Sequence, residues 1–222
     1  MVWGVIVAAV SGAIPINPIE WVNSWDYPEL ALREHRSGST EYTLVVSSGG
    51  RPQACEVTES SGSGDLDMVT CAVAMRRGNF EPARNAQGST IVSLFHGRIN
   101  WSIPGTRSSQ PRPMKPDMEV SIARMPSGID DPATISVAFA VDENGRASDC
   151  TPVEAKLAPW RGALGKPDSS ETAKIKVLGA AACREFMKQV VARQLLDQQG
   201  RAVSSVQTAM IRFSVKPPAE AR

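Results

Sequence analysis

The chain has 222 residues, of which 42% are hydrophobic, so it is long enough for one or two small cores. Its 24 basic residues balance 23 acidic ones, which excludes the strongly basic surface that nucleic acid or anionic lipid would require. Four cysteines occur without a C-x-x-C pattern and away from both histidines, and this favours structural disulfides over a metal site.

The first 16 residues are almost wholly apolar. Small residues at 11–13 follow the apolar run as at the cleavage site of an export signal, although no Lys or Arg precedes it. The run is shorter than the roughly 20 residues that a membrane-spanning helix needs. We expect residues 1–16 to be an export signal, with a buried N-terminal strand or a truncated anchor as the alternatives.

A first domain is expected over residues 17–104. Pro28 opens a short helix, the Gly49-Gly50 turn separates the strands of a hairpin, and Asp65 is expected to cap a second helix. The predicted elements are a helix over 29–35, strands over 40–46 and 53–58, a helix after the loop 60–65, and a strand over 89–103. Phe95, Ile99 and Trp101 share one side of that last strand and are expected in the core.

Residues 105–117 are predicted to be a linker because four prolines occur between 104 and 116 among Ser, Gln and Arg residues. A second domain is expected over 118–217. Its predicted elements are strands over 134–141 and around Cys150 that flank the Asn144-Gly145 turn, a helix from Leu178 to Val190, and a strand over 203–215. The insertion at 155–172 is either an additional binding loop or disordered.

The two domains repeat each other. The segment Leu44–Cys55 matches Phe139–Cys150 at an offset of 95, and residues between Cys71 and Ser102 match those between Cys183 and Ser214 at an offset of 112. We therefore predict two copies of one small α+β domain, each a three-stranded antiparallel sheet with a helix packed on one face.

The repeat also selects one of the three possible cysteine pairings, because each copy should close on itself. It predicts the disulfides Cys55–Cys71 and Cys150–Cys183, each stabilising its copy by roughly 3–4 kcal/mol on the chain-entropy model. Such bonds persist in an oxidising compartment, which indicates the periplasm or the cell exterior.

Several short motifs follow one another in the first copy: Asp26-Tyr27-Pro28, Gly50-Arg51-Pro52, Ser60-Ser61-Gly62, Phe80-x-Pro82-Ala83-Arg84 and Trp101-x-Ile103-Pro104. In this order and spacing they resemble the C-terminal domain of TonB-type energy transducers. The resemblance covers residues 20–104 and is weaker over 134–215, where the hairpin, cysteines, helix and last strand remain. The second copy thus resembles a degenerate member of the same family.

This resemblance implies a non-enzymatic periplasmic module that captures an extended peptide of an outer-membrane receptor by adding it as a strand. It implies contacts near Tyr27 and Pro28 and along the last strand, through Arg98, Asn100 and Ser102. Tyr27 and Pro28 have an alternative role, which is to seat the first helix. No small-molecule substrate, nucleic acid or cofactor is expected.

A cell-envelope structural or adaptor protein is the alternative function, with the two copies packed as an intramolecular pseudo-dimer. Only about ten residues separate the apolar N-terminus from the first domain, and they span at most about 36 Å. If Met1 is the true start, the chain is not expected to work as a complete energy transducer.

Catalysis is not expected, although a disulfide-stabilised secreted enzyme is a further alternative. His35 and His96 are isolated from any nucleophile pattern, and both are expected at the surface. The loop at 60–64 could cradle an anion, but acidic residues follow it, which favours a helix cap.

Overall fold

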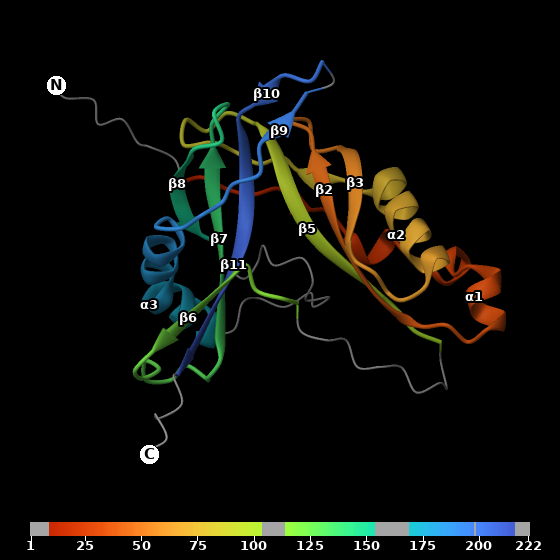
Figure 1. Ribbon diagram of the computed structural model, residues 1–222, viewed down its shortest axis with the longest axis horizontal. Helices are drawn as coiled ribbons and strands as arrows, with labels where there is room; N and C mark the ends of the chain where they lie inside the picture. The colour runs from red at the N-terminus through yellow and green to blue at the C-terminus, as the bar shows by residue number, and fades with distance from the viewer. Residues whose placement is uncertain (1–8, 104–113, 154–168, 198, 216–222) are drawn as a thin grey trace.

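The computed structural model describes residues 9–103, 114–153, 169–197 and 199–215. The expected export signal at 1–16, linker at 105–117 and insertion at 155–172 lie partly or mostly outside these residues. Within them, the centre of the fold is a seven-stranded mixed sheet with the order β3-β2-β5-β11-β7-β8, and β6 also pairs with β11 (Figure 1). The strands are β2 (Gly38–Val46), β3 (Pro52–Glu59), β5 (Val92–Trp101), β6 (Met118–Ile122), β7 (Ala133–Val141), β8 (Ala147–Pro152) and β11 (Ser205–Val215).

Helices and short strand pairs complete the described fold. The helices are α1 (Glu29–Arg33), α2 (Gly64–Arg77) and α3 (Ser169–Phe186), with 3-10 turns at Pro18–Glu20 and Ser24–Asp26. The short pairs are β1 (Ile14–Pro15) with β4 (Phe80–Glu81), and β9 (Leu195–Leu196) with β10 (Ala202–Val203). None of the described helices combines the length and the apolar character that crossing a membrane requires.

Both predicted hairpins are confirmed. β2 pairs with β3 and β7 pairs with β8, each through a turn that contains a glycine at positive φ, 78° for Gly50 and 76° for Gly145. A side chain at Gly50 would also place its Cβ atom 2.1 Å from the Phe80 carbonyl oxygen. This turn therefore requires glycine for both its conformation and its close contact with the chain after α2.

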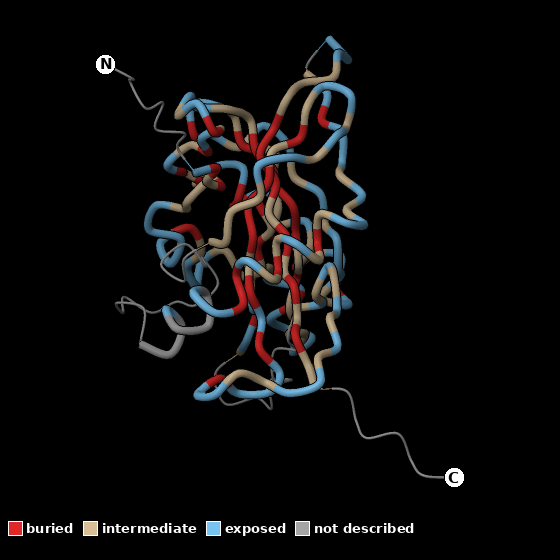
Figure 2. The backbone as a smooth tube through the Cα atoms, turned by 90° about the vertical axis from the view of Figure 1, so that its left-hand side faces the viewer, coloured by how far each residue is buried: buried red, intermediate tan, exposed pale blue. Residues whose placement is uncertain are grey.

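Each part of the sheet has its own helix and core. In the N-terminal half, residues 9–103, α2 packs on β2 and β3, and the cluster that includes Leu44, Val46 and Phe95 is buried. In the C-terminal half, residues 114–215, α3 packs on β7 and β8 over a larger buried cluster that includes Val137 and Ile211. Figure 2 shows the buried residues concentrated along the central strands.

The sequence predicts two three-stranded sheets, whereas the structure joins the strands of both halves into a single sheet. Ser205 and Val206 of β11 pair in parallel with Val92 and Ser93 of β5. In Figure 1 these two strands lie together at the top and diverge toward the bottom. Edge strands present unpaired N–H and C=O groups, so the last strands of the two halves satisfy part of each other's edge.

The two halves also exchange packing segments. The chain after α2 carries Ala83 and Ala86 onto the C-terminal half, where they form a buried cluster with Ala138 and Val206. In the other direction, the chain after α3 brings the Arg193 guanidinium within 2.7 Å of a Glu56 carboxylate oxygen on β3. The halves are therefore in contact through side chains as well as through β5 and β11.

The start of α2 differs from the prediction. The sequence predicts Asp65 as the cap, but the helix begins at Gly64 and its N-cap residue is Ser63, which makes no side-chain capping bond. Asp67 instead ties the first turn to its surroundings, because its carboxylate accepts hydrogen bonds from the Ser61 N–H at 2.9 Å and the Thr40 hydroxyl at 2.8 Å. The Ser-rich loop is thus held by a carboxylate in the first turn of the helix. Desolvation raises the pKa of Asp67, but the hydrogen bonds from Ser60, Ser61 and Thr40 together outweigh it, so the pKa lies below its ordinary value.

Candidate functional site

The candidate site begins at an edge of β5. On one side β5 pairs antiparallel with β2 from Ser93 to Trp101. On the other side the described pairing with β11 ends at Ser93, so no described strand continues it along Leu94–Gly97. This stretch of β5 consequently has one side available for a further strand.

A cavity of about 420 Å³ lies beside this edge. Tyr42, His96 and Gly97 line it from β2 and β5, while residues 114–117 and 208–210 line it from the C-terminal half. Asp117 holds the far wall together, because its N–H donates to the Met210 carbonyl at 2.9 Å and its carboxylate accepts from the Met210 N–H at 2.7 Å. Both halves of the molecule therefore contribute to the cavity.

Tyr42 and Gly97 form the near wall. A Cβ atom at Gly97 would lie 2.6 Å from the Tyr42 hydroxyl oxygen, so the glycine leaves the space that the phenol ring occupies. Tyr42 is 4% exposed, and its hydroxyl makes no hydrogen bond with any residue that the structure describes. Burial raises the pKa of Tyr42, so the hydroxyl stays protonated and can both donate and accept a hydrogen bond.

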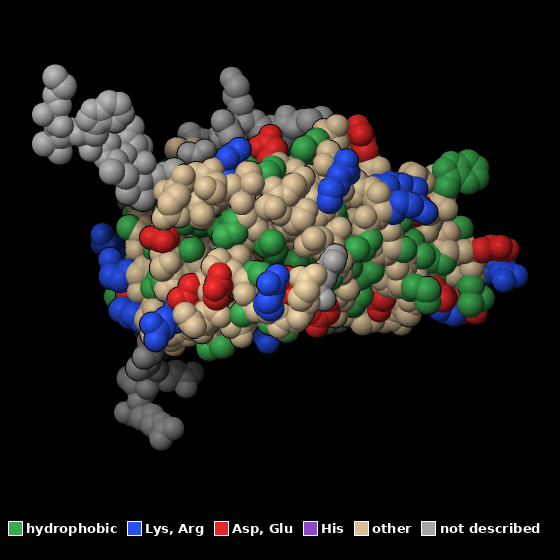
Figure 3. All heavy atoms as spheres, turned by 90° about the horizontal axis from the view of Figure 1, so that it is seen from above, with side chains coloured by type: hydrophobic (Ala, Val, Ile, Leu, Met, Phe, Trp, Pro, Cys, Tyr) green, Lys and Arg blue, Asp and Glu red, His purple; other side chains and the backbone are tan. Residues whose placement is uncertain are grey.

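The charged groups of the cavity are mostly acidic. Among the lining residues that the structure describes, Glu41, Glu59 and Asp117 are acidic and Lys115 is the one Lys or Arg. Glu41 is paired with the guanidinium of Arg98, opposite it on the neighbouring strand. On the face that Figure 3 shows, basic and acidic side chains are interspersed.

His96 is half-buried, whereas the sequence predicts a surface position. Its imidazole Nδ1 lies 3.3 Å from the Thr43 hydroxyl, and the ring lines both this cavity and a neighbouring one of about 560 Å³. The neighbouring cavity is closed by residues 189–191 and Arg193 of the C-terminal half, which explains the burial. Burial lowers the pKa of His96, and Arg193 acts in the same direction, while Asp117 and Glu41 oppose the shift.

We expect His96 to make stability depend on pH. Its folded-state pKa lies below the ordinary value of 6.5, so the unfolded chain takes up a proton first as the pH falls. The free energy of unfolding should then decrease below about pH 6.5, and His96→Gln should remove this decrease. Urea denaturation between about pH 8 and about pH 5 measures the effect.

His35→Asn is the matched control, because His35 is exposed and its φ of 51° suits asparagine. This variant should keep the pH dependence of the wild type. An unchanged pH profile in His96→Gln would contradict the assignment.

The structure places Tyr27 and Pro28 at the start of α1. Pro28 is the N-cap residue, and the Tyr27 hydroxyl donates to the Arg36 carbonyl at 2.5 Å. The Tyr27 ring also packs edge-on against Trp101, with the ring centroids 5.4 Å apart. These contacts fit the alternative in which the Tyr-Pro segment seats the first helix.

The turn before Tyr27 is anchored by an ion pair. The Arg77 guanidinium donates to both carboxylate oxygens of Asp26, at 2.5 and 2.9 Å, and also to the Trp21 carbonyl at 2.8 Å. These hydrogen bonds hold the pKa of the Asp26 carboxyl below its ordinary value. The segment that precedes α1 is thereby tied to the end of α2.

The other predicted contact residues lie at the far end of β5. Arg98 faces Glu41 in a cross-strand ion pair, and Asn100 accepts a hydrogen bond from the Ser39 hydroxyl at 2.7 Å. Ser102 is exposed and follows the last residue of the strand. The structure thus brings Arg98 and Asn100 onto one strand, while Tyr27 contacts the opposite face of that strand through Trp101.

Sequence reasoning missed the cavity and most of its lining residues, Tyr42, Asp117 and Met210 among them. Gly97 did carry a signal, because a glycine inside a predicted strand often marks a place where another group approaches the backbone closely. No comparable signal marks Asp117 or Met210, because their position depends on how the halves pack.

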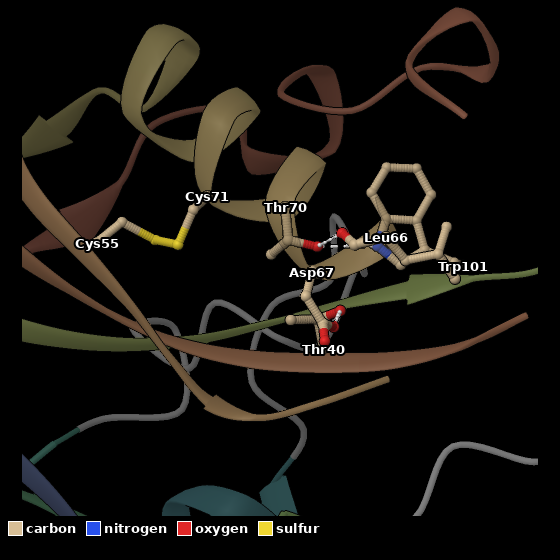
Figure 4. Close-up of a disulfide and its surroundings, with 7 residues drawn as sticks. All are labelled: Thr40, Cys55, Leu66, Asp67, Thr70, Cys71 and Trp101. Carbon is tan, nitrogen blue, oxygen red and sulfur yellow. Dashed lines mark hydrogen bonds between the residues drawn. A yellow bond between two sulfur atoms is a disulfide. The ribbon is translucent and has the colours of Figure 1, made fainter. Parts of the chain in front are cut away.

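Both cysteine pairs lie at disulfide distance and fit the disulfide bonds expected from the sequence. Cys55 on β3 is bonded to Cys71 on α2, and Cys150 on β8 is bonded to Cys183 on α3, each with Cα atoms 5.6 Å apart. Figure 4 shows the first pair joining the hairpin to the helix that also carries Leu66 and Thr70. In the part of the chain that the structure describes, no group of His, Cys, Asp or Glu side chains could hold a metal ion.

Comparison with known proteins gives one family. Residues 23–103 match the family described as Gram-negative bacterial TonB protein C-terminal, which covers α1, the hairpin, α2 and β5. Neither the curated proteins nor the solved structures gave a match. The segment 23–103 is therefore similar to the C-terminal domain of TonB proteins, a non-catalytic family of protein-interaction modules.

Proposed function

We propose that this protein is a non-catalytic periplasmic binding module that captures a receptor peptide by strand addition during TonB-dependent outer-membrane transport. The observation that carries the proposal is the edge of β5 at Leu94–Gly97, where described strand pairing ends next to a cavity. Main-chain pairing with this edge would supply affinity, and the cavity would accept side chains of the peptide.

The side-chain contacts follow from the alternation along β5. Asn100 and Ser102 are exposed at the end of the strand and are proposed as contacts to a peptide that extends past Gly97. Arg98 and Glu41 lie beside this path as an ion pair with side chains 11% and 12% exposed. Tyr27 and Pro28 are proposed to act indirectly, by fixing the end of β5 through Trp101.

Backbone N-methylation of the peptide tests strand addition directly. In a strand, alternate residues direct their N–H and C=O groups to the same side, so only one alternating set can pair with β5. Peptides from the N-termini of outer-membrane receptors of the same organism would be N-methylated at either set. We expect one set to weaken binding at least about tenfold and the other set to leave it nearly unchanged, by calorimetry with the oxidised full chain.

Equal tolerance of both N-methylation patterns by a peptide that binds would contradict strand addition. Absence of binding by all unmethylated peptides would contradict the receptor role itself.

We also propose that the C-terminal half is a second, degenerate copy of the same domain. Equivalent turns support this. The Ser47 and Asp142 N–H groups each donate to the carbonyl oxygen four residues later, and these two turns lie 95 residues apart. The Asn85 and Asp197 N–H groups make the same bond, and their turns lie 112 residues apart. The strand order supports the same conclusion, because hairpin and last strand follow as β3-β2-β5 in one half and in reverse as β11-β7-β8 in the other. Each half also has a disulfide that joins its hairpin to its helix.

A cell-envelope adaptor without energy transduction is the second candidate. It is favoured by the pairing of β11 with Val92 and Ser93, because the C-terminal half then occupies part of the edge that a receptor peptide would use. In this case the two halves form an intramolecular pseudo-dimer whose partner is another envelope protein. The disulfides support the proposed periplasmic location for both candidates, because such bonds need an oxidising compartment.

A further inference from the structure

We infer that the C-terminal half is a built-in competitor of the receptor peptide, because β11 covers the start of the β5 edge and must leave it before a peptide can pair along the whole edge. This inference rests on the proposed function, since it assigns the regulation of that same site. It is carried by the short pairing of β5 with β11, by a buried hydroxyl at the junction of the two strands and by the small side chains that join the halves.

The pairing of β5 with β11 is the shortest main-chain contact in the central sheet that the structure describes. It consists of Ser205–Val206 against Val92–Ser93, whereas β2 pairs with β5 over all of Gly38–Val46. The contact is also parallel, and parallel pairs are slightly less stable per residue than antiparallel ones. A strand that adds to β5 cannot use Val92–Ser93 while β11 occupies these two residues. The peptide and β11 therefore compete for the same stretch of edge.

Ser93 indicates that closing the junction has a cost. The residue is 0% exposed, and its hydroxyl oxygen makes no hydrogen bond with any residue that the structure describes. Its partner on β11 is Val206, which is also fully buried and has an apolar side chain. A buried hydroxyl without a partner destabilises the state that buries it, whereas water can bind to the hydroxyl when the strands part. Opening of the junction would relieve this penalty.

The other contacts between the halves are made by small or exposed side chains. The buried cluster that joins them consists largely of alanines, its members being Val10, Ala83, Ala86, Ala138 and Val206. Alanine buries little apolar surface, so this cluster stabilises closure only modestly. The ion pair of Arg193 with Glu56 has side chains 53% and 58% exposed, and pairs at such positions contribute little. Since each half keeps its own helix and core, the junction can open while both halves stay folded.

Competition of this kind sets the affinity for the peptide. The apparent affinity is reduced to the extent that the junction is closed, because only the open fraction offers the whole edge. A substitution that shifts the junction should thus change peptide binding without contacting the peptide.

Two variants shift the junction in opposite directions. Ala86→Glu places a charge in the buried cluster between the halves, favours the open state and should tighten peptide binding about fivefold or more. Ser93→Ala removes the buried hydroxyl, favours the closed state and should weaken binding about fivefold. Ala72→Glu, at an exposed position of α2, is the matched control and should leave the affinity unchanged. Calorimetry with the oxidised full chain and receptor N-terminal peptides of the same organism gives the affinities.

An NMR signal reports the junction independently of affinity. Ala138 lies on β7, one strand beyond β11, and is buried in the cluster between the halves. Its methyl signal in the wild type should shift as the peptide saturates β5, because opening exposes the cluster to water. This signal and Ser93→Ala decide the question even if Ala86→Glu fails to fold.

Equal affinity of the wild type, Ser93→Ala and a folded Ala86→Glu for a peptide that binds would overturn the competition and leave the proposed function intact. An Ala138 signal that stays unchanged at saturating peptide would also overturn it. Failure of the wild type and of every variant to bind any peptide would overturn the proposed function and this inference with it.

Discussion

Replacing Trp101 with alanine is expected to lower the free energy of unfolding by about 3–5 kcal/mol. The indole is 3% exposed and packs with Leu66 and Ala31 beneath the end of β5. Its Nε1–H donates to the Thr70 hydroxyl at 2.9 Å, and its ring contacts Tyr27 edge-on. Truncation to alanine removes the packing against Leu66 and the hydrogen bond to Thr70, and it leaves a cavity between α2 and the end of β5 (Figure 4). Urea denaturation of the oxidised protein measures the loss.

Trp25→Ala is the matched control, because it deletes the same side chain where it is 93% exposed. Its effect should remain within about 0.5 kcal/mol. Trp101→Phe keeps an aromatic ring but removes the hydrogen bond to Thr70 and part of the packed volume, so its cost should lie between those of the two alanine variants. A cost for Trp101→Ala that equals the cost for Trp25→Ala would contradict the placement of Trp101 in the core.

Loss of the disulfides should have an effect of similar size. On the chain-entropy model, removing Cys55–Cys71, with a sequence separation of 16, costs about 3 kcal/mol. Removing Cys150–Cys183, with a separation of 33, costs about 4 kcal/mol because the longer loop gains more freedom on unfolding. Double Cys→Ser variants of each pair, compared by urea denaturation, give the two values.

A reductant supplies the control for these variants. Adding it to the wild type should reproduce the combined loss, and adding it to a chain without all four cysteines should change nothing. An increase in stability on reduction of the wild type would contradict the assignment of either pair as a structural bond.

The elements that the sequence predicted well are those decided by nearby residues. Gly50 and Gly145 mark their hairpins because each turn needs a positive φ, and the Phe95 and Trp101 alternation predicts the buried side of β5. Such patterns depend on chain geometry over a few residues. They therefore hold regardless of how the rest of the molecule packs.

The parts that were missed depend on how the halves meet. The pairing of β5 with β11 uses main-chain groups, so no side-chain pattern predicts it. The sequence predicts His96 at the surface, and its burial comes from the chain around Arg193, which is distant in sequence. β6 did have a signal, since Met118, Val120 and Ile122 alternate with polar residues, but its parallel partner β11 lies almost 100 residues away. The candidate cavity lies where these long-range contacts come together, so patterns of neighbouring residues could not predict it.

The most direct measurement of the central claim is an NMR titration of the oxidised, isotope-labelled full chain with receptor N-terminal peptides. Strand addition predicts saturable shifts of the Leu94, Phe95 and Gly97 amides, together with the side chain of Tyr42 at the cavity wall. A well-dispersed spectrum without shifts at about 1 mM peptide would contradict the claim that β5 captures receptor peptides, since such binding would be weaker than about −4 kcal/mol.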